Sequence, residues 1–216
     1  MANILGGRGS LFDQFLGELR NVDVQNDRMR FRRNLERIGE LMAYEISKGL
    51  NWESGTLTTP LGEAELPVLN DQPVIATILR AGLPMHQGIL NYFDHADNCF
   101  ISAYRMNHKE DGSFDIKIEY LSSPSVEDRT VILCDPMLAT GGSMVLAYKA
   151  LLKRGTPIHV HVVAAIASRE GLEYCERHLP KNCTIWIAGL DEELTAQAYI
   201  VPGLGDAGDL AFGGKE

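Results

Sequence analysis

Residues 131–143 give the strongest indication of the fold. Their sequence is Val131-Ile132-Leu133-Cys134-Asp135-Pro136-Met137-Leu138-Ala139-Thr140-Gly141-Gly142-Ser143. Four consecutive apolar residues predict a short strand buried on both faces, which is typical of a parallel sheet. The Thr-Gly-Gly-Ser turn predicts the start of a helix that runs from about residue 143 to 154 and ends before Gly155. A strand, a turn and a helix in this order indicate a βαβ unit.

The same order of elements recurs on both sides of this stretch. The expected strands are 74–79, 99–105, 130–134, 158–167 and 184–189, and the expected helices are 28–50, 84–92, 143–154 and 170–178. The alternating pattern in 114–120 predicts a half-buried edge strand, and residues 56–72, interrupted by Pro and Gly, predict a broken hairpin or arm. The whole pattern favours an α/β fold: a twisted parallel sheet flanked by helices, with right-handed crossovers.

The chain has 216 residues, which is enough for one domain with a sizeable core. It contains no internal repeat and no linker, so we expect a single domain over residues 1–216. Residues 1–27 form an N-terminal extension, expected to be a helix or an arm, and residues 190–216 form a glycine-rich C-terminal segment. We expect the two ends of the chain to build a small hood over the sheet.

Charge and cysteine content exclude several classes of protein. The formal net charge is −9, which disfavours non-specific binding of nucleic acid or anionic lipid. An anionic ligand must therefore be held by local donors or by a metal ion. No apolar run approaches the ~18 residues of a membrane helix, the first 20 residues do not resemble a signal peptide, and four scattered cysteines favour reduced thiols in the cytoplasm.

The turn after residue 134 has the chemistry of a phosphate site. In open α/β sheets ligands bind beyond the carboxyl ends of the strands, where helix N-termini offer unpaired N–H groups. Gly141 and Gly142 let the backbone approach a phosphate, and Thr140 and Ser143 add hydroxyl donors. Asp135 is placed to accept hydrogen bonds from sugar hydroxyls. The alternative is a plain turn before a Ser-capped helix, with Asp135 as a surface acid.

Four stretches together resemble the uracil phosphoribosyltransferases, a family of type I phosphoribosyltransferases. Residues 135–143 are similar to their loop for 5-phosphoribosyl diphosphate (PRPP), Leu79–Leu83 resembles their diphosphate-binding turn, and Tyr104-Arg105 resembles the end of the next strand. Residues 199–209 resemble their uracil-recognition segment, which is the most specific of these motifs. The resemblance covers about residue 28 to the end, and it departs from the family pattern at Leu210 and Gly214, where the family usually has a basic residue and a threonine.

The resemblance implies an activity and a set of site residues. The activity is transfer of a phosphoribosyl group from PRPP to uracil, which gives UMP and diphosphate in pyrimidine salvage. The implied catalytic residues are Arg80, Arg105, Asp135 and Asp206. The implied PRPP-binding residues are these four together with Pro136, Met137, Leu138, Ala139, Thr140, Gly141, Gly142 and Ser143, and the implied uracil-binding residues are Ile200, Gly205, Asp206 and Ala207.

The resemblance also implies a cofactor and partners. Mg²⁺ is expected to be held through PRPP and water, with no direct protein ligand. The expected partners are small molecules and further copies of the chain, as a homodimer or homotetramer, with GTP as a candidate allosteric activator and with neither nucleic acid nor membrane. Two alternatives stay open: a phosphoribosyltransferase for another base, against which the C-terminal segment argues, and a regulatory RNA-binding relative on the same fold, against which the net charge argues.

We expect the two substrates to bind in a coupled way. Residues 199–209 of the C-terminal segment are rich in glycine, so we expect no packed side chains to preform them. This stretch should therefore be mobile when the site is empty. PRPP binding should order this segment and the charged tip 106–113, which follows Arg105 and is a candidate lid. Uracil should then bind more tightly, and by reciprocity uracil should tighten PRPP.

Two further patterns have weaker functional interpretations. His159 and His161 share one face of a strand, a spacing that can bind a metal, but without a third ligand packed histidines are favoured. Gly203, Gly205 and Gly208 form a GxGxxG pattern. We reject a dinucleotide site there, because no adequate strand precedes it and too little chain follows.

Overall fold

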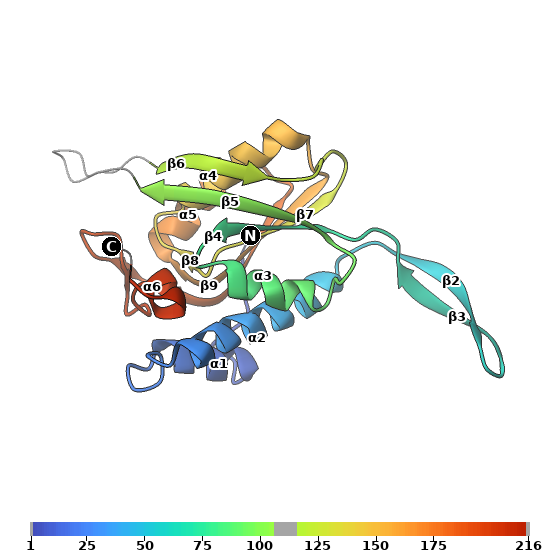
Figure 1. The fold of residues 1–216 in the computed structure, drawn as a ribbon, viewed down its shortest axis with the longest axis horizontal. Helices are drawn as coiled ribbons and strands as arrows, with labels where there is room; N and C mark the ends of the chain where they lie inside the picture. The colour runs from blue at the N-terminus through green and yellow to red at the C-terminus, as the bar shows by residue number, and fades with distance from the viewer. Residues whose placement is uncertain (1, 106–115, 215–216) are drawn as a thin grey trace.

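The computed structural model describes residues 2–105 and 116–214. Its centre is a mostly parallel sheet in the order β1-β10-β9-β7-β4-β5-β6, with β8 paired to β9 (Figure 1). Every pair is parallel except β5 and β6, which are antiparallel. The strands are β1 (Asn3–Ile4), β4 (Val74–Leu79), β5 (Asp97–Arg105), β6 (Ile116–Ser122), β7 (Thr130–Cys134), β8 (Met137–Leu138), β9 (His159–Ser168) and β10 (Cys183–Asp191).

Helices cover both faces of this sheet. They are α1 (Leu11–Arg20), α2 (Arg28–Ser47), α3 (Leu83–Leu90), α4 (Gly142–Leu151), α5 (Arg169–His178) and α6 (Ala207–Phe212), with a short 3-10 helix at Leu152–Arg154. Because successive strand residues point to opposite faces, the core forms two layers. On β7, Ile132 packs on the face covered by α1, α2 and α3, whereas Val131 and Leu133 pack on the face covered by α4 and α5.

The predicted elements are largely confirmed. The strands at 74–79 and 130–134 have the predicted bounds, and the other strands and helices differ by a few residues at their ends. The described part of the alternating pattern, from residue 116 on, belongs to an edge strand, β6. The structure adds β1, a parallel edge strand beside β10 that the sequence did not predict, and it shows that the helical part of the N-terminal extension is α1. Within residues 2–105 and 116–214, no helix has the length and apolarity needed to cross a membrane.

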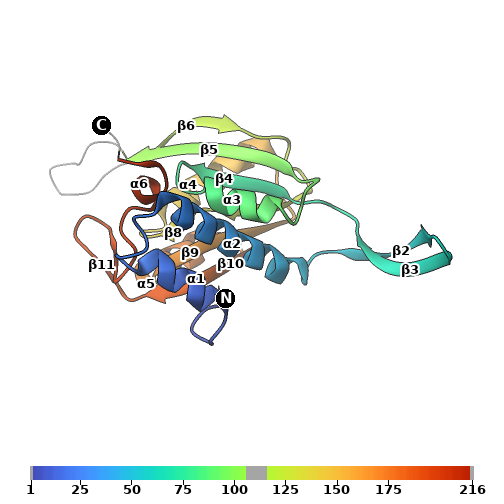
Figure 2. The same ribbon diagram turned by 60° about the horizontal axis from the view of Figure 1, so that its bottom comes forward.

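An antiparallel hairpin extends away from the body of the protein. It consists of β2 (Trp52–Thr59) and β3 (Gly62–Leu69), and both views show it on the side opposite the C-terminal segment (Figures 1 and 2). The prediction of a broken hairpin is wrong in one respect. Pro67 lies within β3, opposite Ser54, and does not interrupt the strand, because an edge of a two-stranded ribbon tolerates a missing N–H.

The carboxyl ends of the parallel strands lie at the same edge of the sheet as the C-terminal segment (Figure 1). That segment contains β11 (Glu193–Leu194), which pairs with β12 (Ile200–Val201), and it then continues into α6. Helix α6 packs on α2. The fold therefore places the turns after β4 and β7 and the C-terminal segment around one volume.

Candidate active site

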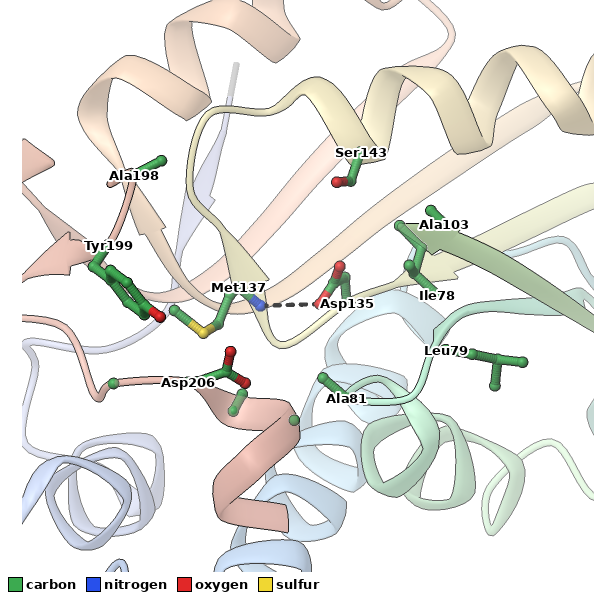
Figure 3. A pocket seen from close by; sticks show the side chains of 13 residues that line it. Ile78, Leu79, Ala81, Ala103, Asp135, Met137, Ser143, Ala198, Tyr199 and Asp206 are labelled. Carbon is green, nitrogen blue, oxygen red and sulfur yellow. Dashed lines mark hydrogen bonds between the residues drawn. The ribbon is translucent and has the colours of Figure 1, made fainter. Parts of the chain in front are cut away.

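A cavity of about 490 Å³ lies beyond the carboxyl ends of β4 and β7. Its walls come from the ends of three strands, the start of α4 and the C-terminal segment (Figure 3). The lining residues are Ile78, Leu79, Ala81, Ala103, Asp135, Met137, Ser143, Ala198, Tyr199, Gly205, Asp206, Ala207 and Gly208. A concave site at this edge of an α/β sheet is where ligands are expected.

Asp135 is held in place by the backbone around it. Its own N–H donates to the carbonyl oxygen of Val163 at 3.1 Å, and its carboxylate accepts from the N–H of Met137 at 3.3 Å. Figure 3 shows this second hydrogen bond beside the cavity. The preceding residue, Cys134, is fully buried, and burial raises the pKa of its thiol to about 12. Cys134 is therefore a neutral core thiol, as the sequence indicated, and Asp135 is the residue that meets the cavity.

The turn before α4 forms a small adjoining hollow of about 20 Å³. Gly141 lies at the N-terminus of α4 with a φ of +78°, and a Cβ there would lie 2.8 Å from the carbonyl oxygen of Gly171. Glycine is therefore required by both conformation and space. The buried Ser168 hydroxyl donates to the carbonyl oxygen of Ala139, which fixes the turn from behind. The helix N-terminus and the Thr140 and Ser143 hydroxyls can together hold an anion.

The C-terminal segment closes the other side of the cavity. Asp206 caps α6 by accepting from the N–H of Asp209 at 3.0 Å, and its carboxylate faces the cavity in Figure 3. Gly205, with a φ of +90°, and Ala207 line the same wall. Tyr199 stands on this side as well, near Met137 (Figure 3). Carboxylates from two walls, Asp135 and Asp206, thus face one shared volume.

Arg80 follows β4 but does not line the cavity. Its Nη2 donates to a carboxylate oxygen of Asp209 at 3.0 Å and to the carbonyl oxygen of Gly213 at 3.1 Å. Its Nε is buried and has no hydrogen-bond partner among the described residues. The guanidinium therefore links the turn after β4 to the C-terminal segment.

Comparisons with known proteins give the family. A family model described as uracil phosphoribosyltransferase matches residues 10–214. The chain belongs to the uracil phosphoribosyltransferase family.

Relatives and a solved structure agree over nearly the whole chain. A uracil phosphoribosyltransferase of Porphyromonas gingivalis is 57% identical over 98% of this chain and 97% of its own length. One from Methanothermobacter thermautotrophicus is 39% identical over 87% of this chain and 85% of its own length. A solved structure of a protein from Aquifex aeolicus has a TM-score of 0.87 and 31% identity, and the match covers 99% of this chain and 98% of that one.

The family and the fold class predicted from the sequence are confirmed. The match to the uracil phosphoribosyltransferase model also begins at residue 10, earlier than the resemblance at about residue 28, so most of the N-terminal extension is part of the family's common chain. The sequence resemblance did not extend over residues 10–27 because α1, which lies there, carries no motif with a chemical role.

The structure brings together most of the residues that the sequence assigned to the site. Asp135, Met137, Ser143, Gly205, Asp206 and Ala207 line the main cavity, and Leu138, Ala139, Thr140 and Gly141 line the adjoining hollow. Pro136, Gly142, Arg80 and Ile200 line neither. The side chain of Arg105 and the candidate lid 106–113 lie outside the described residues; the backbone of Arg105 ends β5.

The C-terminal segment differs from the sequence-based expectation in two respects. The C-terminal segment does have packed side chains: Ile200, Leu204, Ala207 and Ala211 are buried in the core, so the argument that glycines leave it unformed is wrong. Tyr199, the first residue of the predicted uracil-recognition segment, has no predicted role, yet it lines the cavity. An aromatic side chain beside a predicted base site was the available signal.

The histidine pair and the GxGxxG glycines have the structural roles that the sequence favoured. The Nδ1 of His161 accepts from the Trp186 indole at 3.1 Å, and the Nε2 of His159 is 2.9 Å from the Thr184 hydroxyl, so both are packed histidines. Among the described residues no group of three or more His, Cys, Asp or Glu could hold a metal. The GxGxxG glycines lead into α6, a six-residue helix, and not into a βαβ unit.

Proposed function

We propose that this protein transfers the 5-phosphoribosyl group of PRPP to uracil, giving UMP and diphosphate in pyrimidine salvage. The observation that carries the proposal is the single cavity where the phosphate-type turn before α4 meets the C-terminal segment, in a chain of this family. Both substrates must meet in one cavity for a direct transfer, and no covalent nucleophile is needed. The neutral, buried Cys134 is in keeping with such a reaction.

PRPP is assigned to the wall formed by the turns after β7 and β4. The 5-phosphate would accept from backbone N–H groups and hydroxyls at Thr140–Ser143, where the helix N-terminus favours negative charge. Asp135 would accept from the ribose hydroxyls. The remaining loop residues would shape the hollow around the phosphate, as the hydrogen bond between Ser168 and Ala139 already does.

Uracil is assigned to the wall formed by the C-terminal segment. The backbone of Ile200, Gly205 and Ala207 would match its alternating carbonyl acceptors and N–H donors. Cytosine reverses the donor and acceptor order at N3 and C4, which would leave buried groups unpaired and cost enough to reject it. Tyr199 and Met137 lie beside this wall and offer flat and apolar contact to a planar base.

The leaving diphosphate needs positive charge. As the bond at the anomeric carbon breaks, the sugar becomes oxocarbenium-like and negative charge develops on the diphosphate. Arg80 and Arg105 are the assigned cations. Since Arg80 is paired with Asp209, diphosphate would replace that carboxylate as its partner. Asp206 lines the same cavity as Asp135, from the C-terminal segment, and would orient the bound PRPP and metal ion.

The donor set of the cavity fits a Mg²⁺ ion that arrives with its substrate. Asp135 and Asp206 supply two carboxylates that can accept hydrogen bonds from Mg²⁺-bound water, and diphosphate and water would supply the oxygen ligands that Mg²⁺ prefers. When bound, Mg²⁺ would neutralise part of the diphosphate charge. The protein residues would hold the ion through water.

Assembly and location are part of the proposal. The hairpin has an apolar face formed by Leu57 on β2 and by Ala64, Leu66 and Val68 on β3, and every residue of the hairpin is at least partly exposed. We assign this face to contact with another copy of the chain, in a homodimer or homotetramer. The proposal also includes GTP as a candidate allosteric activator. The four cysteines are unpaired thiols, which supports the cytoplasm as the proposed location.

The deciding experiment is a PRPP- and Mg²⁺-dependent assay with uracil, cytosine and purine bases, with UMP and diphosphate identified as products. We expect turnover with uracil alone. Turnover with a purine in place of uracil would contradict the assigned base. For the RNA-binding alternative, a gel-shift assay at physiological salt is expected to show no complex.

A further inference from the structure

Gly203, in the C-terminal segment, has both of its peptide groups bonded to one ion pair. Its N–H donates to Oδ2 of Asp191 at 3.0 Å, and its carbonyl oxygen accepts from Nη1 of Arg20 at 3.0 Å. Arg20 and Asp191 are joined by two hydrogen bonds of 2.8 Å each, Nη1 to Oδ2 and Nη2 to Oδ1. The planar, two-pronged geometry of arginine makes this pairing possible, and lysine cannot reproduce it.

The backbone at Gly203 admits little variation. Its φ is +61°, and a Cβ there would lie 2.0 Å from the carbonyl oxygen of Ile200. The next residue, Leu204, is buried in the core. Two residues later the chain reaches Gly205 and Asp206, which line the cavity. The position of Gly203 therefore sets where the cavity wall begins.

The ion pair belongs to rigid parts of the fold. Arg20 ends α1, whose Phe12, Leu16 and Leu19 are buried, and Asp191 ends β10. The side chain of Asp191 is only 7% exposed. Burying such a pair costs desolvation energy that its mutual attraction often only offsets. Because the other side-chain hydrogen bonds of this pair, among the described residues, all go to one glycine, positioning explains the pair better than stability does.

We propose that Arg20 and Asp191 are positioning residues for base recognition: they hold Gly203 so that the backbone of residues 205–207 keeps the shape that reads uracil. The proposal rests on the proposed function, in that uracil is taken as the base. It also gives the N-terminal extension a role in the reaction, because α1 supplies one member of the pair without lining the cavity.

The test compares Arg20→Lys and Asp191→Asn with a matched control, Arg30→Lys. Arg30 makes an equally short two-bond pair with Glu18, but among the described residues neither side chain has a hydrogen bond to the C-terminal segment. We expect Arg20→Lys to raise KM for uracil about tenfold or more, the effect of losing roughly 1.4 kcal/mol, with KM for PRPP and the melting temperature close to those of the control. Asp191→Asn should act in the same direction. An unchanged KM for uracil, or equal rises for both substrates with a fall in melting temperature, would overturn the proposal.

A second measurement separates this proposal from the assigned activity. Amide hydrogen exchange of residues 199–209 in the ligand-free protein should be faster in Arg20→Lys than in Arg30→Lys, whichever base the enzyme uses. Unchanged exchange would overturn the positioning role even if uracil is the substrate. If exchange is faster in Arg20→Lys but the enzyme does not use uracil, the assigned base is wrong and the positioning of Gly203 by Arg20 and Asp191 is supported.

Discussion

His161 is a buried histidine that stays neutral. Burial, and to a smaller extent the neighbouring His159, lowers the pKa of His161 to about 4. Its ring accepts a hydrogen bond from Trp186, so the neutral form is the one that the core accommodates. In the unfolded chain a histidine titrates near its ordinary pKa of about 6.5.

This difference predicts a pH-dependent stability. Between about pH 6.5 and 4 the unfolded chain binds a proton at His161 and the folded chain does not, so the free energy of unfolding should fall as pH falls through that window. The full effect of this site is on the order of 3 kcal/mol. Urea denaturation of His161→Gln should show a shallower fall than the wild type, whereas the exposed His95→Gln should match the wild type. Identical pH slopes for the wild type and His161→Gln would refute this account.

At the scale of elements, the hairpin of β2 and β3 is the part least supported by the rest of the chain. A lone two-stranded hairpin is marginally stable in water, and this one exposes apolar side chains on one face. Contact with another copy would cover that face. The paired residues show which substitutions test this: Leu66 lies on the apolar face, and Thr56 lies on the opposite face.

We therefore predict that Leu66→Glu shifts the protein toward monomer, because a charge would have to be buried at the contact. Sedimentation velocity at micromolar concentration measures the shift. Thr56→Glu, on the other face of the same hairpin, should leave the assembly as in the wild type. Equal sedimentation of Leu66→Glu and wild type would show that this face is not the contact.

How much the sequence could predict differs between these elements. The strands β4 and β7 are short apolar runs with one packing solution, so their bounds could be predicted from the residues alone. The two residues of β1 have no periodicity, and their pairing depends on the exposed edge of β10. Proline at position 67 suggested a break, but only the pairing partners of a strand decide whether a missing N–H matters.

The candidate site shows the same division. Asp135 and the Thr-Gly-Gly-Ser turn could be predicted because their residue types serve a local geometry. The contacts of Arg80 with Asp209 and of Arg20 with Asp191 and Gly203 could not, because each arginine meets residues more than 100 positions away. Side chains of this kind acquire their partners only when the tertiary fold forms.

At the scale of the whole molecule, the cavity has one wall for each proposed substrate. Because both walls face the same volume, PRPP and uracil are expected to influence each other's binding. We predict that a non-reactive PRPP analogue with Mg²⁺ tightens uracil binding, and that uracil tightens the analogue by the same factor. Typical coupling is on the order of 1–3 kcal/mol, about 5- to 150-fold.

Calorimetric titration of uracil with and without the analogue measures this coupling. The packed residues of the C-terminal segment mean that coupling need not come from ordering the whole segment. Release of Arg80 from Asp209 when diphosphate binds offers a direct route, because Asp209 lies on α6 beside the base wall. Equal uracil affinity in the two titrations would exclude coupling of either origin.

The meeting of the two chain ends has a consequence for how the protein is made. Helices α1 and α2 emerge from the ribosome before the segment that they hold, from Tyr199 to Phe212. A nascent chain that has reached only residue 190 contains the central sheet and the phosphate-type turn, but it has no wall for the base. Partial chains, whether stalled or cut short by a premature stop codon, are thus expected to be unable to carry out the transfer. The chain can then carry out the transfer only after residues 199–212 leave the exit tunnel and dock on α1 and α2, which were translated before them.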